Sequence, residues 1–297
     1  MSAQKPVIGV IGGSGVYDLD GLQDIHWKAV KSPFGEPSDE LLHGRLGDVQ
    51  LIFLPRHGRG HKISPSEINY RANIDALKRA GVTEVISVSA CGSFEEKLAP
   101  GTFVIIDQFI DRTFAREKSF FTSGLVAHVS MADPVCNRLG DVLESAANEQ
   151  GIPVVRGGTY LAMEGPQFSS RAESELYRSW GCQVIGMTNM PEAKLAREAE
   201  ICYATVAMVT DYDCWHPDHE NVDVAAVIKV LMGNSEKARS LITAVAPKLA
   251  KRQSSCESGC HQALDNSLIT APEARDPEIL KKLDAVAGRL LNNEQET

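Results

Sequence analysis

Residues 7–15 read VIGVIGGSG, an apolar run that ends directly in a glycine-rich turn. Its β-branched side chains and its abrupt end are typical of a buried strand, because such residues pack well on a pleated surface. Four more runs share this character, at residues 49–54, 84–89, 102–107 and 204–209. The sequence therefore predicts at least five buried strands.

Helical patterns separate these strands. Tyr70, Ile74 and Leu77 follow the spacing of one helix face, and Asp133 and Pro134 are placed as the N-cap and first residue of a helix over residues 135–142. Ser170 opens an S-x-x-E capping box at the start of a further helix, which Gly181 can end. Pro191 suits the first turn of another helix. Because strands and helices alternate, the predicted fold class is α/β.

The last part of the chain has a different composition. Residues 222–250 and 279–290 have helical periodicity, whereas residues 251–275 between them are polar. We therefore predict one domain over residues 1–297, in which residues 251–297 form a polar linker and a C-terminal helix.

The bulk composition excludes several classes of protein. Hydrophobic residues make up 43% of the chain, as in globular domains, and the net charge is -9 without a dense Lys/Arg run. This charge argues against a nucleic-acid partner, which needs clustered cations. No run of 18 apolar residues and no signal-peptide pattern occurs, so we expect no membrane partner and a cytoplasmic protein.

The cysteines lack the spacing of a zinc site, so buried reduced thiols are the simplest interpretation. Cys256 and Cys260, four residues apart in the polar stretch, leave a redox or bridging role open. The seven cysteines are Cys91, Cys136, Cys182, Cys202, Cys214, Cys256 and Cys260.

Candidate anion-binding groups follow three of the predicted strands. The turn after the first strand can present backbone N–H groups and the Ser14 hydroxyl to a phosphate, although a purely structural turn explains it equally well. The second strand ends in PRHGRGH, where Arg56 can grip phosphate with two parallel hydrogen bonds and His57 can donate a third. The third strand ends in Ser89 and Ala90, which offer a hydroxyl and backbone N–H groups.

Later motifs suit a flat, polar ligand. Phe168 lies in a loop before the capping box and can stack on a base, with core packing as the alternative. Asp211 and Asp213 follow the last apolar run, and residues two apart in an extended chain point to the same side. A metal site with His216 and His219 is the competing interpretation of this pair.

These motifs occur together in a known order. With VIGVIGGSG, PRHGRGH, SACGSFEE, TFVIIDQFIDRT, EGPQFSSRAES, VIGMTNMPEA and TDYDCW, the chain resembles the methylthioadenosine phosphorylase branch of the purine nucleoside phosphorylase family over residues 7–250. The resemblance implies a single α/β domain with a mixed, partly barrel-like sheet flanked by helices. It also implies a homotrimer or a dimer of trimers, with no metal and no organic cofactor.

The resemblance further implies roles for individual residues. Gly186 stands where asparagine is common beside the ribose. The implied phosphate site is Ser14, Arg56, His57, Ser89, Ala90 and Thr188. The implied nucleoside site is Met187 at the ribose, Phe168, Ser169, Asp211 and Asp213 at the base, Val224 and Val227 at a methylthio group, and His128 reaching a neighbouring subunit's site.

The expected reaction is phosphorolysis of 5'-methylthioadenosine to adenine and 5-methylthioribose 1-phosphate. Asp211 would hydrogen bond to or protonate purine N7, which needs a raised pKa, and Asp213 would accept a hydrogen bond from the 6-amino group. The alternatives are a 6-oxopurine nucleoside or methylthioinosine phosphorylase, a nucleoside hydrolase, and a non-catalytic nucleoside-binding protein.

Overall fold

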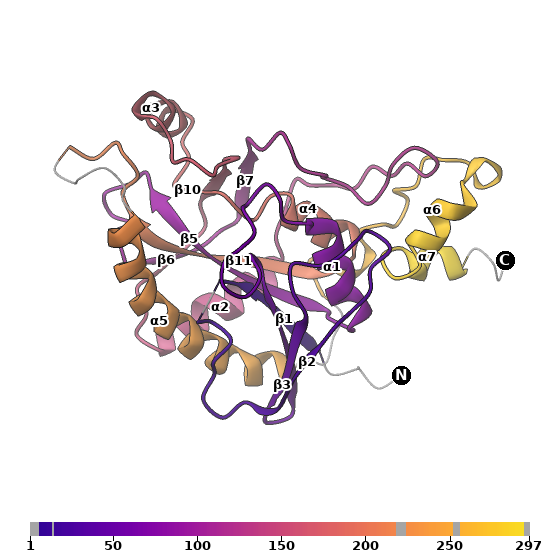
Figure 1. Cartoon of the computed structure of the whole chain (residues 1–297), viewed down its shortest axis with the longest axis horizontal. Coiled ribbons are helices and arrows are strands. Elements are labelled where there is room, and N and C mark those ends of the chain that lie inside the picture. Colours follow the sequence, from indigo (N-terminus) through magenta and orange to yellow (C-terminus); the bar gives the residue numbers. More distant parts are fainter. Residues whose placement is uncertain (1–5, 14, 218–223, 252–255, 294–297) are drawn as a thin grey trace.

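The computed structural model describes residues 6–13, 15–217, 224–251 and 256–293, without the side chains of residues 224, 226, 292 and 293. It contains a single domain built around one mixed sheet (Figure 1). The strands are β1 (Val7–Gly12), β2 (Gln23–Lys28), β3 (Leu41–Leu46), β4 (Val49–Pro55), β5 (Glu84–Ser93), β6 (Phe103–Ile105), β7 (Gln108–Asp111), β8 (Val154–Arg156), β9 (Thr159–Ala162), β10 (Val184–Gly186) and β11 (Cys202–Asp211).

The sheet branches at β5. One path follows the order β2-β3-β4-β1-β5-β10-β9-β7, and β11 pairs with the other side of β5 and continues to β6 and β8. Strand β1 pairs in parallel with β5 only over Glu84–Ser87, and β10 pairs antiparallel with β5 at Gly92 and Ser93. Because β5 continues past the end of β1, a space opens between the carboxyl end of β1 and strand β10. Ligands of open α/β sheets bind at such strand ends.

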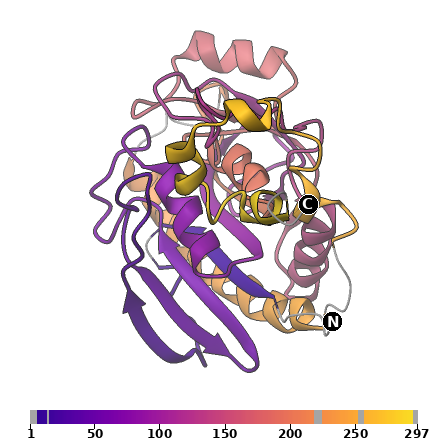
Figure 2. The same ribbon diagram turned by 90° about the vertical axis from the view of Figure 1, so that its right-hand side faces the viewer.

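Helices cover both faces of the sheet. Figure 1 shows α5 along one side and the C-terminal helices at the far end, and Figure 2 shows the β2–β3 hairpin and α3 at opposite ends of the molecule. The helices are α1 (Tyr70–Arg79), α2 (Asn137–Glu149), α3 (Arg171–Ser179), α4 (Glu192–Glu198), α5 (Val224–Ala250), α6 (Pro277–Lys282) and α7 (Gly288–Asn293), with 3-10 turns at Cys260–Gln262 and Pro272–Ala274.

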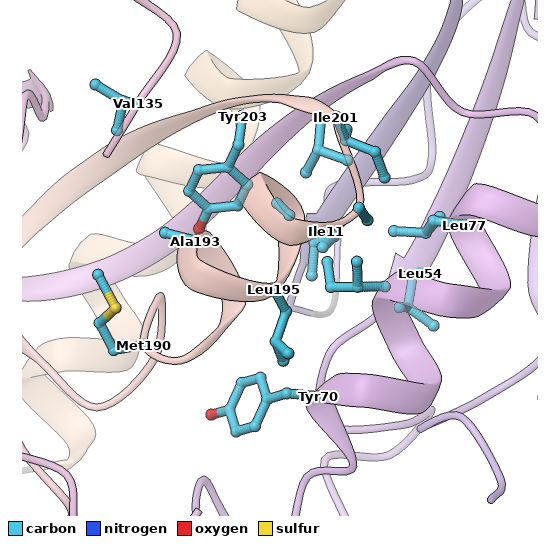
Figure 3. Close-up of a cluster of buried hydrophobic side chains, with 14 of the residues drawn as sticks. Ile11, Leu54, Tyr70, Leu77, Val135, Met190, Ala193, Leu195, Ile201 and Tyr203 are labelled. Atoms are coloured by element: carbon cyan, nitrogen blue, oxygen red, sulfur yellow. The ribbon is translucent and has the colours of Figure 1, made fainter. Parts of the chain in front are cut away.

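Two large apolar cores lie on the two faces. The first packs α1 and α4 against the sheet, with Leu77, Leu195 and Ile201 close together in Figure 3. The second packs α2 and α5 against the other face and includes Leu139 and Leu241. No helix within the described ranges is long and apolar enough to cross a membrane.

Most of the predicted elements form, and the predicted capping box of Ser170 and Glu173 is confirmed at the start of α3. Two predicted helix boundaries are wrong. Helix α2 begins at Asn137 with Cys136 as its N-cap, so Asp133 and Pro134 lie before the helix. The helical pattern at residues 279–290 is split between α6 and α7, and Leu283 is the C-cap of α6.

Residues 256–275, the described part of the predicted linker, fold onto the domain. This segment packs against the domain, burying Cys260 and Leu264. Leu268 also forms an isolated bridge with Ala127. A polar composition gave little sign of this packing, because only a few apolar side chains anchor the segment.

Candidate active site

A cavity of about 600 Å³ lies at the strand ends where β5 continues past β1. Residues from the ends of β1, β4, β5, β10 and β11 line it, together with the beginning of α5. The structure brings most of the predicted site residues together here: Arg56, His57, Ser89, Ala90, Phe168, Met187, Thr188, Asp211, Asp213 and Val227.

Four predicted residues lie elsewhere or cannot be placed. Ser169 is half-buried beside the cavity, and its hydroxyl lies 3.6 Å from Met163 Sδ. His128 is exposed and away from this cavity, with its backbone N–H donating to the Ser267 carbonyl. Ser14 and the side chain of Val224 lie outside the described residues.

Arg56 is buried at the floor of the cavity, in an ion pair with Glu192. Its Nε lies 3.0 Å from Glu192 Oε2 and its Nη2 lies 3.2 Å from Oε1. Burial alone would lower the pKa of Arg56, but the charge and hydrogen bonds of Glu192 more than reverse this and raise it. The two parallel hydrogen bonds expected to hold phosphate are therefore made to Glu192. Nη1 donates to the Val88 carbonyl, which leaves its second proton for a ligand.

A network of buried polar groups surrounds this ion pair. Ser87 Oγ lies 2.6 Å from Glu192 Oε1 and 2.7 Å from Arg56 Nη2, and the Tyr203 hydroxyl donates to Glu192 Oε1 at 2.8 Å. Asn189 Nδ2 donates to the hydroxyl of Ser89, which lines the cavity. The network fixes the groups around Arg56 and Ser89, because buried polar groups are costly unless they are satisfied.

His57 is held as a neutral imidazole. Its Nδ1 lies 2.9 Å from the Ile63 carbonyl, an acceptor, so Nδ1 carries the proton. Burial, together with the positive charge of Arg56, lowers the pKa of His57 to about 4, although the hydrogen bond to Ile63 opposes the shift. The free Nε2 is then an acceptor rather than the donor that the sequence suggested. It suits a protonated phosphate oxygen.

Asp211 lies at the end of β11 and is mostly buried. Its Oδ1 accepts a hydrogen bond from the Asp213 N–H at 2.8 Å, and its Oδ2 lies 2.7 Å from Thr210 Oγ1. Burial raises the pKa of Asp211, although these two hydrogen bonds oppose the shift. The shift has the direction that a general acid requires.

Asp213 is a buried carboxyl without full hydrogen bonding. Within the described part of the chain, its Oδ2 has no hydrogen-bond partner. Burial raises the pKa of Asp213, and the charge of Asp211 also raises it. The nearby hydroxyl of Ser174 lowers this pKa, although it does not form a hydrogen bond to Asp213 in the structure. Asp213 reaches the cavity because it adopts a left-handed conformation with φ 51°, rather than through the strand alternation predicted from sequence.

The metal interpretation of this acidic pair finds little support in the structure. Among the described residues, the groups of three or more metal-binding side chains comprise four cysteines and include neither Asp211 nor Asp213. His219 lies outside the described residues.

The comparisons with known proteins agree with this architecture. The sequence pattern of the Phosphorylase superfamily matches residues 7–247. The chain belongs to this superfamily. It is 65% identical over 288 residues to an S-methyl-5'-thioadenosine phosphorylase of Rhodospirillum rubrum. The matched region covers 97% of this chain and 98% of the relative.

Solved structures of similar proteins show the same fold. A methylthioadenosine phosphorylase from an antarctic soil metagenomic library has a TM-score of 0.89 at 46% identity, covering 95% of this chain and 99% of the other. A methylthioadenosine phosphorylase from Schistosoma mansoni in complex with adenine has a TM-score of 0.83 at 37% identity. The match covers 89% of this chain and 99% of the other. The mixed α/β fold class expected from the sequence is thereby confirmed.

Sequence reasoning missed three residues that shape the cavity. Glu192 neutralises Arg56, and Arg116 donates through Nη1 to the carbonyl of Met187 at 2.8 Å. Tyr160 fills the space beside Gly186, where an added Cβ would lie 1.9 Å from the Tyr160 hydroxyl. The sequence holds one signal for Tyr160, which is the glycine at position 186 where asparagine is common. A glycine there indicates a close neighbour, but a single sequence cannot identify that neighbour.

Proposed function

We propose that this phosphorylase cleaves 5'-methylthioadenosine with inorganic phosphate, giving adenine and 5-methylthioribose 1-phosphate. The observation that carries the proposal is the buried Oδ2 of Asp213, which has no hydrogen-bond partner among the described residues, in a cavity that Arg56 and His57 also line. A buried acceptor without a donor is costly, and the 6-amino group of adenine supplies a donor. A 6-oxo group would instead place two acceptors against each other.

The phosphate end supplies the nucleophile. Phosphate there would accept hydrogen bonds from Arg56 Nη1 and from the hydroxyls of Ser89 and Thr188, which line the cavity. One phosphate oxygen forms a bond to C1' of the ribose while the bond from C1' to purine N9 breaks. The anion also stabilises the positive charge that develops on the ribose.

At the base, Asp211 would give its proton to N7, so that adenine leaves as a neutral molecule. Thr210 Oγ1 lies 3.2 Å from the Cys91 carbonyl and 2.7 Å from Asp211 Oδ2, and its single proton cannot serve both. While Asp211 carries the proton for N7, Thr210 donates to the Cys91 carbonyl. After proton transfer, the Thr210 hydroxyl can turn and donate to the new carboxylate, which stabilises the product state.

Apolar side chains favour the 5'-methylthio group. Val227, Ile228 and Leu231 of α5 line one wall of the cavity. Such a wall stabilises a thioether more than a hydroxyl, by about 1–3 kcal/mol for a difference of this size. We further propose that the protein acts in the cytoplasm as a homotrimer or dimer of trimers, that His128 contributes to a neighbouring subunit's site, and that catalysis needs no metal or organic cofactor.

The test is to incubate the purified protein with methylthioadenosine, with and without phosphate, and to follow adenine release beside adenosine and methylthioinosine. Phosphate-dependent release that is fastest with methylthioadenosine supports the proposal. Activity on methylthioinosine alone would contradict the role of Asp213. Release without phosphate would indicate a hydrolase, and binding without release a nucleoside-binding protein.

Replacing Asp213 by Asn is expected to lower the preference for methylthioadenosine over methylthioinosine by at least about tenfold, because an amide can donate to a 6-oxo group. The ratio of the two kcat/KM values measures this change. Asp24→Asn is a matched control, since Asp24 is exposed with φ 55°, a conformation that Asn also tolerates. An unchanged ratio of the two kcat/KM values in Asp213→Asn would show that Asp213 does not recognise the base.

Gly92 allows the close approach of the acidic pair to β5. A Cβ at this position would lie 2.8 Å from Asp211 Oδ1 and 3.3 Å from the Asp213 nitrogen. We expect Gly92→Ala to displace the carboxyl and lower kcat/KM by about 10²-fold. The control is Gly233→Ala in α5, where a Cβ meets nothing within 4 Å. Full activity in Gly92→Ala would show that the reaction does not depend on the exact position of the Asp211 carboxyl.

A further inference from the structure

Four cysteines from separate parts of the chain meet on the face of the sheet away from α1. Cys136 precedes α2, Cys202 begins β11, and Cys256 and Cys260 belong to the C-terminal segment. All four are buried, and their Sγ atoms all lie within 4.8 Å of one another. The cluster lies outside the proposed active site, because none of the four lines that cavity.

The spacing of the sulfur atoms suits a metal ion better than disulfides. Four thiolates bound tetrahedrally to zinc at about 2.3 Å place their sulfur atoms roughly 3.8 Å apart. Cys136 Sγ and Cys256 Sγ are 3.5 Å apart, whereas a disulfide requires about 2.05 Å, and all four cysteines are free. We propose that Cys136, Cys202, Cys256 and Cys260 form a structural tetrathiolate site for a zinc ion.

The surroundings can balance the charge of such a site. Four thiolates and one Zn²⁺ leave two negative charges. Arg197 Nη1 lies 3.8 Å from Cys260 Sγ and supplies positive charge, whereas the charge of Arg138 is already paired with Glu84 at 2.7 Å. Cys136 is also the N-cap of α2 without a side-chain cap hydrogen bond, so its sulfur lies at the positive end of a helix of 13 residues.

A groove lies next to the cluster, although none of the four cysteines lines it. A polar groove of about 1000 Å³ is lined by Arg138, Arg197, Ser258 and Gly259, which adjoin the four cysteines in sequence or in space. Ser258 Oγ lies 4.0 Å from Cys136 Sγ. Residues of the groove therefore approach Cys136 and Cys260, whose sulfur atoms are themselves buried.

The ion would hold the C-terminal segment on the domain. Cys256 and Cys260 are at the start of this segment, and the Ser267 carbonyl further along accepts a hydrogen bond from the His128 N–H. Binding free energy for a closed thiolate site adds to folding stability. The proposal departs from the sequence-based expectation of no metal, and it is independent of the reaction proposed above.

The first experiment measures metal in the full-length protein, purified under reducing conditions and dialysed against a trace of Zn²⁺. We expect about one zinc per chain. Replacement of zinc by Co²⁺ should give thiolate-to-cobalt charge-transfer bands in the near ultraviolet and the visible bands of a tetrahedral site. Absence of bound metal and of these bands, or an intact mass that shows paired cysteines in the reduced preparation, would overturn the proposal.

Substitutions test the ligand set. Cys256→Ser and Cys260→Ser are each expected to lose the bound zinc and the difference in Tm between zinc-loaded and chelator-treated protein. Cys182→Ser is the matched control, because Cys182 is buried but outside the cluster. Zinc retained in both cluster variants would contradict the assignment. The metal content of the unsubstituted protein tests the proposal even if a variant fails to fold.

Discussion

Asp211→Asn is expected to lower kcat for methylthioadenosine phosphorolysis by about 10²–10³-fold, because an amide cannot transfer a proton to N7. Phosphate-dependent release of adenine measures the loss, with Asp24→Asn as the surface control. A decrease in kcat of less than about tenfold would show that Asp211 is not the general acid. The KM for methylthioadenosine should change much less, because the amide can still form a hydrogen bond to the base.

The same substitution separates catalysis from stability. Burial raises the pKa of Asp211, so the folded protein binds this proton more tightly than the unfolded chain does. The free energy of unfolding therefore falls as the pH rises from the ordinary pKa of an Asp to the raised pKa of the folded state. Asn lacks this dependence, so the variant should be at least as stable as the parent at neutral pH. A large decrease in Tm would indicate a structural role.

Arg56→Met is expected to lower the free energy of unfolding by about 3–5 kcal/mol, because it leaves the buried carboxylate of Glu192 without its partner. Arg56 is only 2% exposed and Glu192 only 1%, so water cannot replace the lost interaction. Denaturant unfolding measures the change. A loss below about 1 kcal/mol would show that the network readily rearranges.

The double variant Arg56→Met with Glu192→Gln distinguishes folding from phosphate binding. Gln removes the buried charge and keeps an acceptor for Ser87 and Tyr203. We expect it to recover most of the lost stability, while the KM for phosphate stays high because the Arg56 donor is absent. If the double variant recovers both the stability and the KM for phosphate of the parent, Arg56 affects activity only through stability.

The C-terminal region shows why some features escape sequence reasoning. Cys136, Cys202 and the pair Cys256 and Cys260 are far apart in the chain, and no local spacing connects these three positions. Their meeting depends on how α2 and β11 pack and on where the chain returns after α5. Local periodicity carries no information about where the chain returns, so a polar stretch by itself predicts a linker.

The acidic pair illustrates the same limit at the active site. The sequence placed Asp211 and Asp213 at a strand end but predicted convergence through strand alternation. In the structure β11 stops at Asp211, and a left-handed turn brings Asp213 to the cavity. Strand alternation is a local property, whereas the turn packs closely against Gly92 of β5, a residue distant in sequence.

By itself, the sequence determined the α/β class, most strands and helices, the capping box of α3, and the groups of polar residues that follow the strands. These features depend on side chains near one another in the chain. Only the tertiary structure decided that Glu192 pairs with Arg56, that His57 presents an acceptor, and that Asp213 Oδ2 has no partner within the described ranges. Burial and charge pairing arise from residues distant in sequence, and they decide which polar groups remain available to a ligand.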